Sequence, residues 1–275
     1  MRSRVDPAIE IVNKSVAFGH ARYALFDFDG TLSLIRSGWQ KIMTSMMVEV
    51  LKCTPLGQLE AVETLEAEVV AYITRLTGRQ TIYQMIRLCE EVNKRKGESL
   101  PPLEYKRDYH ARLTELIGNR IVSLQDRTVS PEKFLVPFAY QFLASLHNLE
   151  AKCFLASGTD EVFVEEEVRL LGIRDFFFGI YGALDDWTQF SKRKVIRNLV
   201  IENGLRGEEF VSFGDGFVEI EETKAVGGIA VGVASDELNR CGIDPWKRKR
   251  LIEAGADVII PDFSCYEQLS ALLFV

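Results

Sequence analysis

The segment Tyr23–Thr31, YALFDFDGT, gives the clearest indication of the fold. Its first four residues are apolar, Asp27 and Asp29 follow, and Gly30 comes next. A short unbroken apolar run is typical of a strand that is buried on both faces, and the glycine marks a turn. The segment therefore predicts a buried strand that ends in two carboxylates.

The chain beyond residue 129 alternates between extended and helical patterns. Apolar runs that predict strands occur at 152–156, 176–181, 210–213, 229–233 and 258–260, and helical patterns lie at 137–147, 162–171, 194–202 and 219–226. Strands that alternate with helices indicate right-handed βαβ units. We therefore expect an α/β fold with a doubly wound, Rossmann-like parallel sheet, to which the strand near residue 25 also belongs.

A long helical stretch interrupts this alternation after the first strand. Apolar side chains, several of them methionines, recur there at spacings of three and four residues, which favours core packing over a ligand surface. We therefore expect an α/β core formed by residues 1–36 and 130–275, with an all-α cap domain formed by residues 37–129 inserted into it.

Reactive side chains stand where the predicted strands end. Asp27 and Asp29 follow the first strand, Ser157 follows the second and Asp215 a later one, while Lys192 stands in the loop before a helix. Ligands of open parallel sheets bind at the carboxyl ends of strands, so we expect these groups to meet. Carboxylates this close resist ionisation unless a cation offsets their charge, and Mg²⁺ with its oxygen ligands suits that task.

This set of groups predicts phosphoryl transfer. An aspartate beside a metal ion can attack phosphorus and form an aspartyl-phosphate. A second carboxylate can protonate the leaving oxygen and later activate water. A serine and a lysine can bind the charge on the phosphoryl oxygens.

The segments that carry these groups resemble the motifs of the haloacid dehalogenase-like superfamily. DFDGT at 27–31 resembles the first motif, LASGT with Ser157 the second, and SFGDGFVEIE with Asp215 and Glu219 the fourth. SKRKVI resembles the third, although family members usually have glycine where this chain has Arg193. The motifs occur in the family's order, and the resemblance extends from about residue 20 to 265.

The resemblance implies roles in metal binding and acid/base chemistry. Asp27 would be the nucleophile and a metal ligand. Asp29 would be the acid/base and would also bind metal through its backbone carbonyl. Asp215 would complete the Mg²⁺ site.

The resemblance also implies how the phosphoryl group is held. Ser157, Gly158 and Lys192 would bind it, and Lys194 is the rival to Lys192. Glu219 would steady Lys192 or help to bind the metal.

The inserted segment offers candidates for substrate recognition. A turn at 77–81 joins two predicted helices, and in relatives a loop at a comparable place reaches the active site. Arg79 and Gln80 are therefore candidates for substrate contacts, while a plain helix-to-helix turn is the alternative. Arg36 and Trp39, just past the first motif, either face the substrate or pack at the hinge.

Composition excludes several other classes of protein. The 275 residues carry 33 basic and 40 acidic side chains, a formal net charge of −7, which argues against a nucleic-acid or anionic-membrane binder. The basic segment 239–250 is interpreted as an exposed helix face, with binding of an anionic partner as the alternative. Without a long apolar run or a secretory signal, and with five scattered cysteines, the chain is expected to be cytoplasmic. The oligomeric state, monomer or homodimer, and the role of residues 1–20 stay open.

The leading interpretation is a Mg²⁺-dependent phosphomonoester hydrolase that acts on a small phosphorylated metabolite, such as a sugar phosphate or a phosphoglycolate-like ester. A phosphomutase of the β-phosphoglucomutase type is the alternative. A metal-free 2-haloacid dehalogenase would gain nothing from Asp29 and Asp215, and a non-catalytic module would be expected to lack the nucleophile or the metal ligands.

Overall fold

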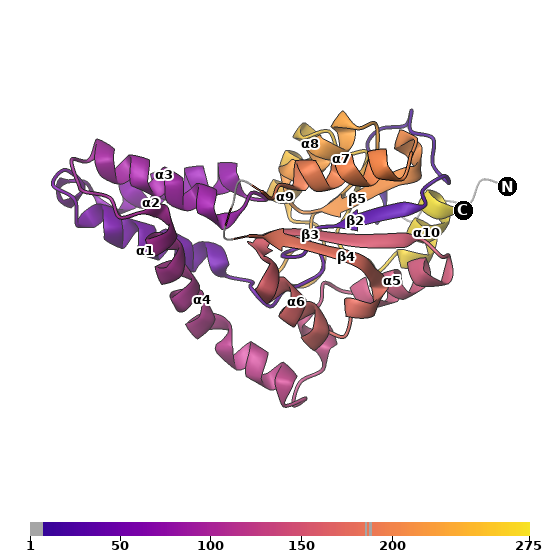
Figure 1. Cartoon of the computed structure of the whole chain (residues 1–275), viewed down its shortest axis with the longest axis horizontal. Coiled ribbons are helices and arrows are strands. Elements are labelled where there is room, and N and C mark those ends of the chain that lie inside the picture. The colour runs from indigo at the N-terminus through magenta and orange to yellow at the C-terminus, as the bar shows by residue number, and fades with distance from the viewer. Residues whose placement is uncertain (1–7, 185, 187–188) are drawn as a thin grey trace. The chain divides into compact units, whose positions relative to one another are not determined.

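The computed structural model describes residues 8–184, 186 and 189–275, and their contacts divide the chain into two units (Figure 1). One unit contains the described residues up to Ser37 together with those of Ser123–Val275. The other is the inserted unit, Gly38–Val122.

The larger unit is built on a single sheet. Within the described residues its strands are β1 (Glu10–Ile11), β2 (Tyr23–Phe26), β3 (Lys152–Asp160), β4 (Phe177–Ala183), β5 (Phe210–Gly214), β6 (Ile229–Val233) and β7 (Val258–Ile260). Their order across the sheet is β1-β7-β6-β5-β2-β3-β4, and every neighbouring pair is parallel except β1 with β7. The predicted α/β fold with a doubly wound parallel sheet is confirmed.

Helices cover both faces of this sheet. They are α5 (Ala139–Asn148), α6 (Glu161–Leu170), α7 (Lys192–Glu202), α8 (Phe217–Ala225), α9 (Pro245–Glu253) and α10 (Tyr266–Phe274), with short 3-10 turns at Pro131–Phe134, Arg174–Phe176 and Gly207–Glu209. Figure 1 shows α7, α8 and α9 on one face and α5, α6 and α10 on the other. Strands covered in this way are buried, which explains why β2, β5 and β6 consist of apolar and small residues.

An aromatic core lies beneath the two central strands. Phe26 of β2 and Phe213 of β5 stack with their ring centres 4.7 Å apart, and Phe142 of α5 meets Phe213 edge-on at 5.1 Å. Phe263 stacks on Phe142 at 5.0 Å, and all four side chains are fully buried. Packed aromatic rings hold a single arrangement, so the ends of β2 and β5 are fixed beside each other.

The N-terminal segment contributes the edge strand β1, which pairs with β7 in antiparallel register. Arg248 of α9 also binds Glu10 of β1, with Nε 2.7 Å from the carboxylate. The sequence left the role of the first twenty residues open. The structure shows that Glu10–Ile11 within this segment belong to the sheet. Residues 1–7 lie outside the described residues.

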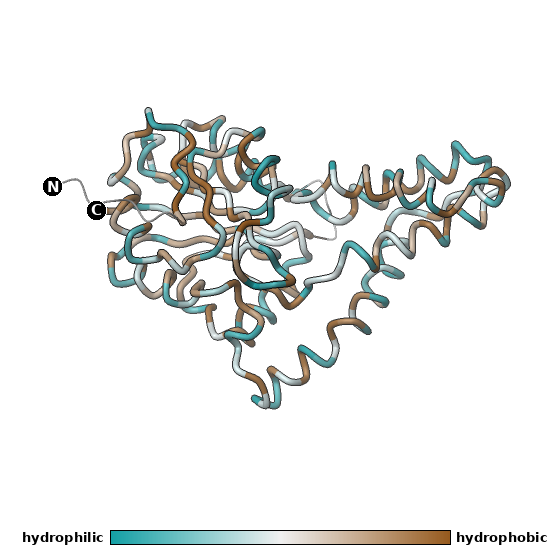
Figure 2. Tube along the Cα trace, turned by 180° about the vertical axis from the view of Figure 1, so that it is seen from behind, coloured by the Kyte–Doolittle hydropathy of each residue, from teal (hydrophilic) through white to brown (hydrophobic). Residues whose placement is uncertain are grey.

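The inserted unit consists of helices. They are α1 (Trp39–Lys52), α2 (Val62–Leu76), α3 (Thr81–Lys94) and α4 (Pro102–Gln125), which runs past Val122, with a 3-10 turn at Gly57–Leu59. Apolar and polar residues alternate along these helices in Figure 2. Met46, Met47 and Met85 are fully buried, so the methionine-rich stripe is core packing, as predicted.

Among the described residues, no helix combines the length and the apolar character that are needed to cross a membrane.

Candidate active site

The two central strands bring the first and fourth motifs together. The chain proceeds from β2 to β3 and β4 on one side and returns to β5 on the other, so the strand order reverses between β2 and β5. The backbone N–H of Asp27 donates to the carbonyl of Phe213 at 2.9 Å. Asp27 and Asp215 therefore leave the same edge of the sheet, at the place where such sheets bind ligands.

Three carboxylates meet at this edge. Asp27, Asp215 and Glu219 each offer one oxygen atom, and these atoms all lie within 4.8 Å of one another. Glu219 is held there by the first turn of α8, because its carboxylate accepts a hydrogen bond of 2.8 Å from the backbone N–H of Gly216. Asp27 and Glu219 are buried, so the cluster is largely withdrawn from water.

Lys192 completes the cluster from α7. Its Nζ lies 2.7 Å from Oδ1 of Asp27 and 2.9 Å from Oε2 of Glu219, and only 3% of its side chain is exposed. The sequence placed Lys192 in a loop before the helix, which is wrong: it is the first residue of α7, whose N-terminus is capped by the hydroxyl of Ser191. Lys194, the rival lysine, is exposed and lines a separate cavity.

The electrostatics of the cluster follow from burial. Removal from water raises the pKa of Asp27 well above its usual range, the Lys192 ammonium opposes this shift, and Glu219 and Asp215 add to it. Burial alone would lower the pKa of Lys192, but the carboxylates of Asp27 and Glu219 raise it, so this lysine keeps its charge. The cluster thus has more carboxylates than the lysine can neutralise.

Asp29 lies beside the second motif. Its Oδ2 accepts hydrogen bonds from Thr159 Oγ1 at 2.8 Å and from Ser157 Oγ at 3.4 Å, and its Oδ1 is 3.9 Å from Nε of Arg36. Burial raises the pKa of Asp29, and the charge of Arg36 opposes the shift. A carboxyl group with a raised pKa is suited to giving and taking a proton.

The second motif is ordered by its own hydrogen bonds. The buried hydroxyl of Ser157 accepts from the backbone N–H of Thr159 at 3.1 Å, across the half-buried Gly158. Thr159 is a site residue that the sequence did not identify, although it belongs to the segment LASGT. The available signal was that a threonine two residues after the serine can return its hydroxyl to the same site.

Gly30 allows the first motif to approach Asp215. Its φ of +78° is in the left-handed region, and a Cβ there would lie 2.2 Å from Oδ2 of Asp215. Any other residue would meet both backbone strain and a collision. The glycine of the first motif is thus required by close packing as well as by the turn.

Lys247 is a further site residue that the sequence did not identify. Its Nζ lies 2.9 Å from Oδ2 of Asp215 and 2.8 Å from Oε1 of Glu237. The interpretation of residues 239–250 as an exposed helix face is therefore wrong for Lys247, whose side chain is 9% exposed. The usable signal was Asp244-Pro245, which marks a helix start and places Lys247 in the first turn of α9.

Four candidate residues remain, Arg36 in the larger unit and three in the inserted unit. Arg36 is buried, pairs with Glu167 of α6 and lies beside Asp29. Trp39, Arg79 and Gln80 belong to the inserted unit. Arg79 is exposed with its guanidinium 5.9 Å from the ring centre of Tyr83, and Gln80 is buried at the start of α3. Contacts between Arg79 or Gln80 and a substrate stay a prediction.

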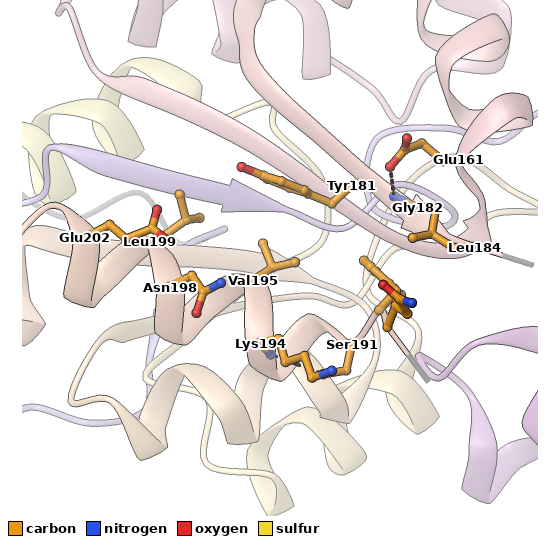
Figure 3. A pocket seen from close by; sticks show the side chains of 12 residues that line it. Glu161, Tyr181, Gly182, Leu184, Ser191, Lys194, Val195, Asn198, Leu199 and Glu202 are labelled. Carbon is orange, nitrogen blue, oxygen red and sulfur yellow. Dashed lines mark hydrogen bonds between the residues drawn. The ribbon is translucent and has the colours of Figure 1, made fainter. Parts of the chain in front are cut away.

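A cavity of about 340 Å³ lies between β4 and α7 (Figure 3). Lys194 and Asn198 of α7 line it together with Ser191, which caps this helix, and Tyr181 and Leu184 lie opposite. None of the clustered carboxylates lines this cavity, so it is separate from the acid cluster.

The acid cluster fits a hard divalent cation. Its three carboxylate oxygens are close together and only partly neutralised, and two of the three residues are buried. Oxygen donors of this kind suit Mg²⁺. The side chain of Asp29 is turned toward the second motif instead, so Asp27, Asp215 and Glu219 are the side chains placed to hold a cation.

Fold and site together define the class of protein: an α/β enzyme whose carboxylates are gathered at the switch point of a parallel sheet. Residues 21–227 match the model of the haloacid dehalogenase-like hydrolases, and the chain belongs to this family. Its members are hydrolases that generally use a divalent metal ion. Comparison with curated proteins gives no significant match.

Solved structures support the same fold. A predicted phosphoglycolate phosphatase from Haemophilus somnus 129PT has a TM-score of 0.60 at 16% identity, covering 91% of this chain and 98% of that one. A predicted phosphatase from Clostridium acetobutylicum has a TM-score of 0.58 at 16% identity, with coverage of 92% and 99%. A family hydrolase from Deinococcus radiodurans R1, with bound phosphate and sodium, has a TM-score of 0.52 at 14% identity, with coverage of 92% and 98%.

Proposed function

We propose that this protein is a Mg²⁺-dependent phosphomonoester hydrolase that acts through an aspartyl-phosphate. The observation that carries the proposal is the contact of Lys192 with Asp27, next to the half-buried carboxylate of Asp215 and the buried carboxylate of Glu219. A nucleophilic carboxylate beside a fixed ammonium group is suited to phosphorus, because the ammonium also attracts the phosphoryl oxygens.

Each residue has a defined task in the proposed reaction. An oxygen of Asp27 attacks phosphorus, the bond from phosphorus to the ester oxygen breaks, and protonated Asp29 gives its proton to that oxygen. Water then attacks the aspartyl-phosphate, Asp29 takes up a proton, and phosphate leaves as the Asp27 carboxylate is regenerated. Mg²⁺ would be held by Asp27, Asp215 and the backbone carbonyl of Asp29, because both oxygens of Glu219 already accept hydrogen bonds from Gly216 and Lys192. The ion would offset the negative charge of the carboxylates and the phosphoryl group.

The phosphoryl group is bound by the second and third motifs in this proposal. The hydroxyl of Ser157, the adjoining Gly158 and the ammonium of Lys192 hold its oxygens, and Glu219 keeps Lys192 in position through the 2.9 Å contact. The hydroxyl of Thr159 orients Asp29.

The substrate we propose is a small phosphorylated metabolite, such as a sugar phosphate or a phosphoglycolate-like ester, in the cytoplasm. The inserted unit would act as a cap that excludes water, with Arg79 and Gln80 as substrate contacts. Arginine suits a second anionic or hydroxyl-rich group on such a substrate.

The test is phosphate release from a panel of small phosphate esters, with Mg²⁺ and with a chelator, for the wild type and Asp27→Asn. Release should require Mg²⁺ and should be lost in Asp27→Asn, which removes the nucleophile at nearly constant volume. Asp126→Asn, at an exposed position, is the matched control and should keep wild-type turnover. Wild-type turnover by Asp27→Asn would falsify the mechanism. A folded wild type that releases no phosphate but interconverts sugar phosphates would indicate a phosphomutase.

A further inference from the structure

Lys247 has three partners around its ammonium group. Nζ donates to Asp215 Oδ2 at 2.9 Å, to Glu237 Oε1 at 2.8 Å and to Ser235 Oγ at 3.3 Å. The hydroxyl of Ser235 donates in turn to the backbone carbonyl of Gly30 at 2.8 Å. Lys247 therefore joins the fourth motif, through Asp215, to the turn of the first motif.

The position of Lys247 is unfavourable except for these contacts. It lies in the first turn of α9, where Asp244 caps the N-terminus and accepts from the backbone N–H of Lys247 at 3.0 Å. The positive end of a helix dipole repels a cation, and burial removes the ammonium from water. The contacts with the two carboxylates and the hydroxyl offset both costs. These three contacts therefore hold the ammonium of Lys247 in its position.

The contact with Lys247 limits what Asp215 can offer to a metal ion. Because the ammonium occupies Oδ2, one oxygen of this carboxylate is left for a cation. The carboxylate of Glu237 is engaged by the same ammonium. Mg²⁺ binds carboxylates through few, well-oriented oxygens, whereas Ca²⁺ takes more oxygens and readily accepts a carboxylate through both.

We propose that Lys247 determines metal specificity at this site, favouring Mg²⁺ over Ca²⁺ by keeping Oδ2 of Asp215 and the carboxylate of Glu237 out of the metal's reach. The inference rests on the proposed Mg²⁺-dependent function. It goes beyond the four motifs, because Lys247 lies outside all of them.

The test is calorimetric titration of the wild type and of Glu237→Gln/Lys247→Met with MgCl₂ and with CaCl₂. The double change removes one negative and one positive charge, so net charge is conserved while Oδ2 of Asp215 is freed. Mg²⁺ and Ca²⁺ carry the same charge, so the ratio of their dissociation constants responds to the available oxygens and not to the overall field. Changes in groups that contact metal ligands alter affinity by about 10–100-fold. We expect the preference for Mg²⁺ over Ca²⁺ to fall at least tenfold.

Two further variants complete the experiment. Lys247→Met alone should lower the same ratio, and it replaces the double variant if circular dichroism shows that the latter is unfolded. Lys249→Met, on the same helix with 75% of the side chain exposed, should keep the wild-type ratio.

The outcomes separate this inference from the proposed function. A Mg²⁺/Ca²⁺ ratio within threefold of wild type in the Lys247 variants would overturn the inference and leave the phosphatase proposal intact, even if both affinities changed together. A wild type without preference for Mg²⁺ would also overturn it. A wild type that binds neither ion would overturn the Mg²⁺-dependent function, and the inference with it.

Discussion

Arg36 Nη2 lies 2.6 Å from Oε1 of Glu167, and both side chains are buried. Arg36 is nine residues beyond Asp27, its Nε is 3.9 Å from Oδ1 of Asp29, and its guanidinium lies 5.4 Å from the ring centre of Phe163 on α6. The pair therefore ties the segment that leads out of the first motif to α6, and it places a positive charge beside Asp29.

Glu167 should make stability depend on pH. Burial raises its pKa to about 7, against the pairing with Arg36, from a usual value of 4.5. Between pH 4.5 and 7 the folded protein then holds a proton that the unfolded chain releases. The contribution of Glu167 to the free energy of unfolding is therefore full below pH 4.5 and is lost as the pH rises to 7. Glu167→Gln removes the titration. The stability of wild type relative to Glu167→Gln should fall across this window, by at most about 1.4 kcal/mol per pH unit.

Thermal unfolding midpoints between pH 4.5 and 8 measure this difference. Glu150→Gln, at an exposed position outside α6, is the control and should follow the wild type at every pH. A stability of wild type relative to Glu167→Gln that rises with pH would show that Glu167 titrates in the opposite sense.

The parts of the site that sequence predicted share a physical reason. Asp27 and Asp215 directly follow apolar strands of β-type pattern, and parallel strands bring such residues to one edge. Lys247 could not be predicted in this way. The sequence shows only that residues 239–250 are basic, and which of these cations is buried depends on where α9 begins. The two-residue strand β1 is too short for any period to show.

Asp29→Asn should separate the two halves of the proposed reaction. p-Nitrophenolate leaves without needing a proton, so formation of the aspartyl-phosphate should continue, whereas its hydrolysis needs Asp29 as a base. We expect a burst of about one p-nitrophenol per site followed by turnover that is roughly 10²–10⁴-fold slower. Rapid-quench kinetics with p-nitrophenyl phosphate measures both phases, and Asp27→Asn should show neither. Equal loss of burst and turnover in Asp29→Asn would contradict the assignment.

Glu91 should stabilise the inserted unit. This buried carboxylate is 2.8 Å from both Lys94 Nζ and Arg95 Nη1, and it also pairs with Arg87. Burial favours a higher pKa, but the hydrogen bonds and charges of these cations hold the pKa of Glu91 at about 2. The pKa of Glu91 in the folded protein is depressed from 4.5. The contribution of this carboxylate to the free energy of unfolding is therefore present above pH 4.5 and is lost as the pH falls toward 2.

Glu91→Gln should therefore destabilise the inserted unit at pH 7 by about 3 kcal/mol, because it leaves buried cations short of a partner. Hydrogen exchange of the α2 and α3 amides measures this locally. Glu90→Gln, at a more exposed carboxylate that pairs with Arg87, should change the stability of the inserted unit by less than about 1 kcal/mol. If the difference in stability between wild type and Glu91→Gln became larger below pH 4.5, the pKa of Glu91 would not be depressed in the folded protein.

Lys192 and Lys194 provide the sharpest comparison for the third motif. Lys192 is buried between Asp27 and Glu219, whereas Lys194 is exposed and only two residues away. Lys192→Ala should lower kcat by roughly 10²–10³-fold, as expected for the loss of a fixed charge at the phosphoryl group. Lys194→Ala should leave kcat within threefold of wild type.

Lys192→Ala should also be less stable than Lys194→Ala, because it leaves two buried carboxylates without their cation. Lys192→Arg separates the two effects: it keeps the charge and should recover the unfolding midpoint, while its larger, planar head group displaces the phosphoryl oxygens and leaves kcat low. Initial rates on the best ester and thermal unfolding of all three variants give the comparison. If Lys194→Ala were the variant that loses activity, the phosphoryl-binding lysine would be two positions further along α7.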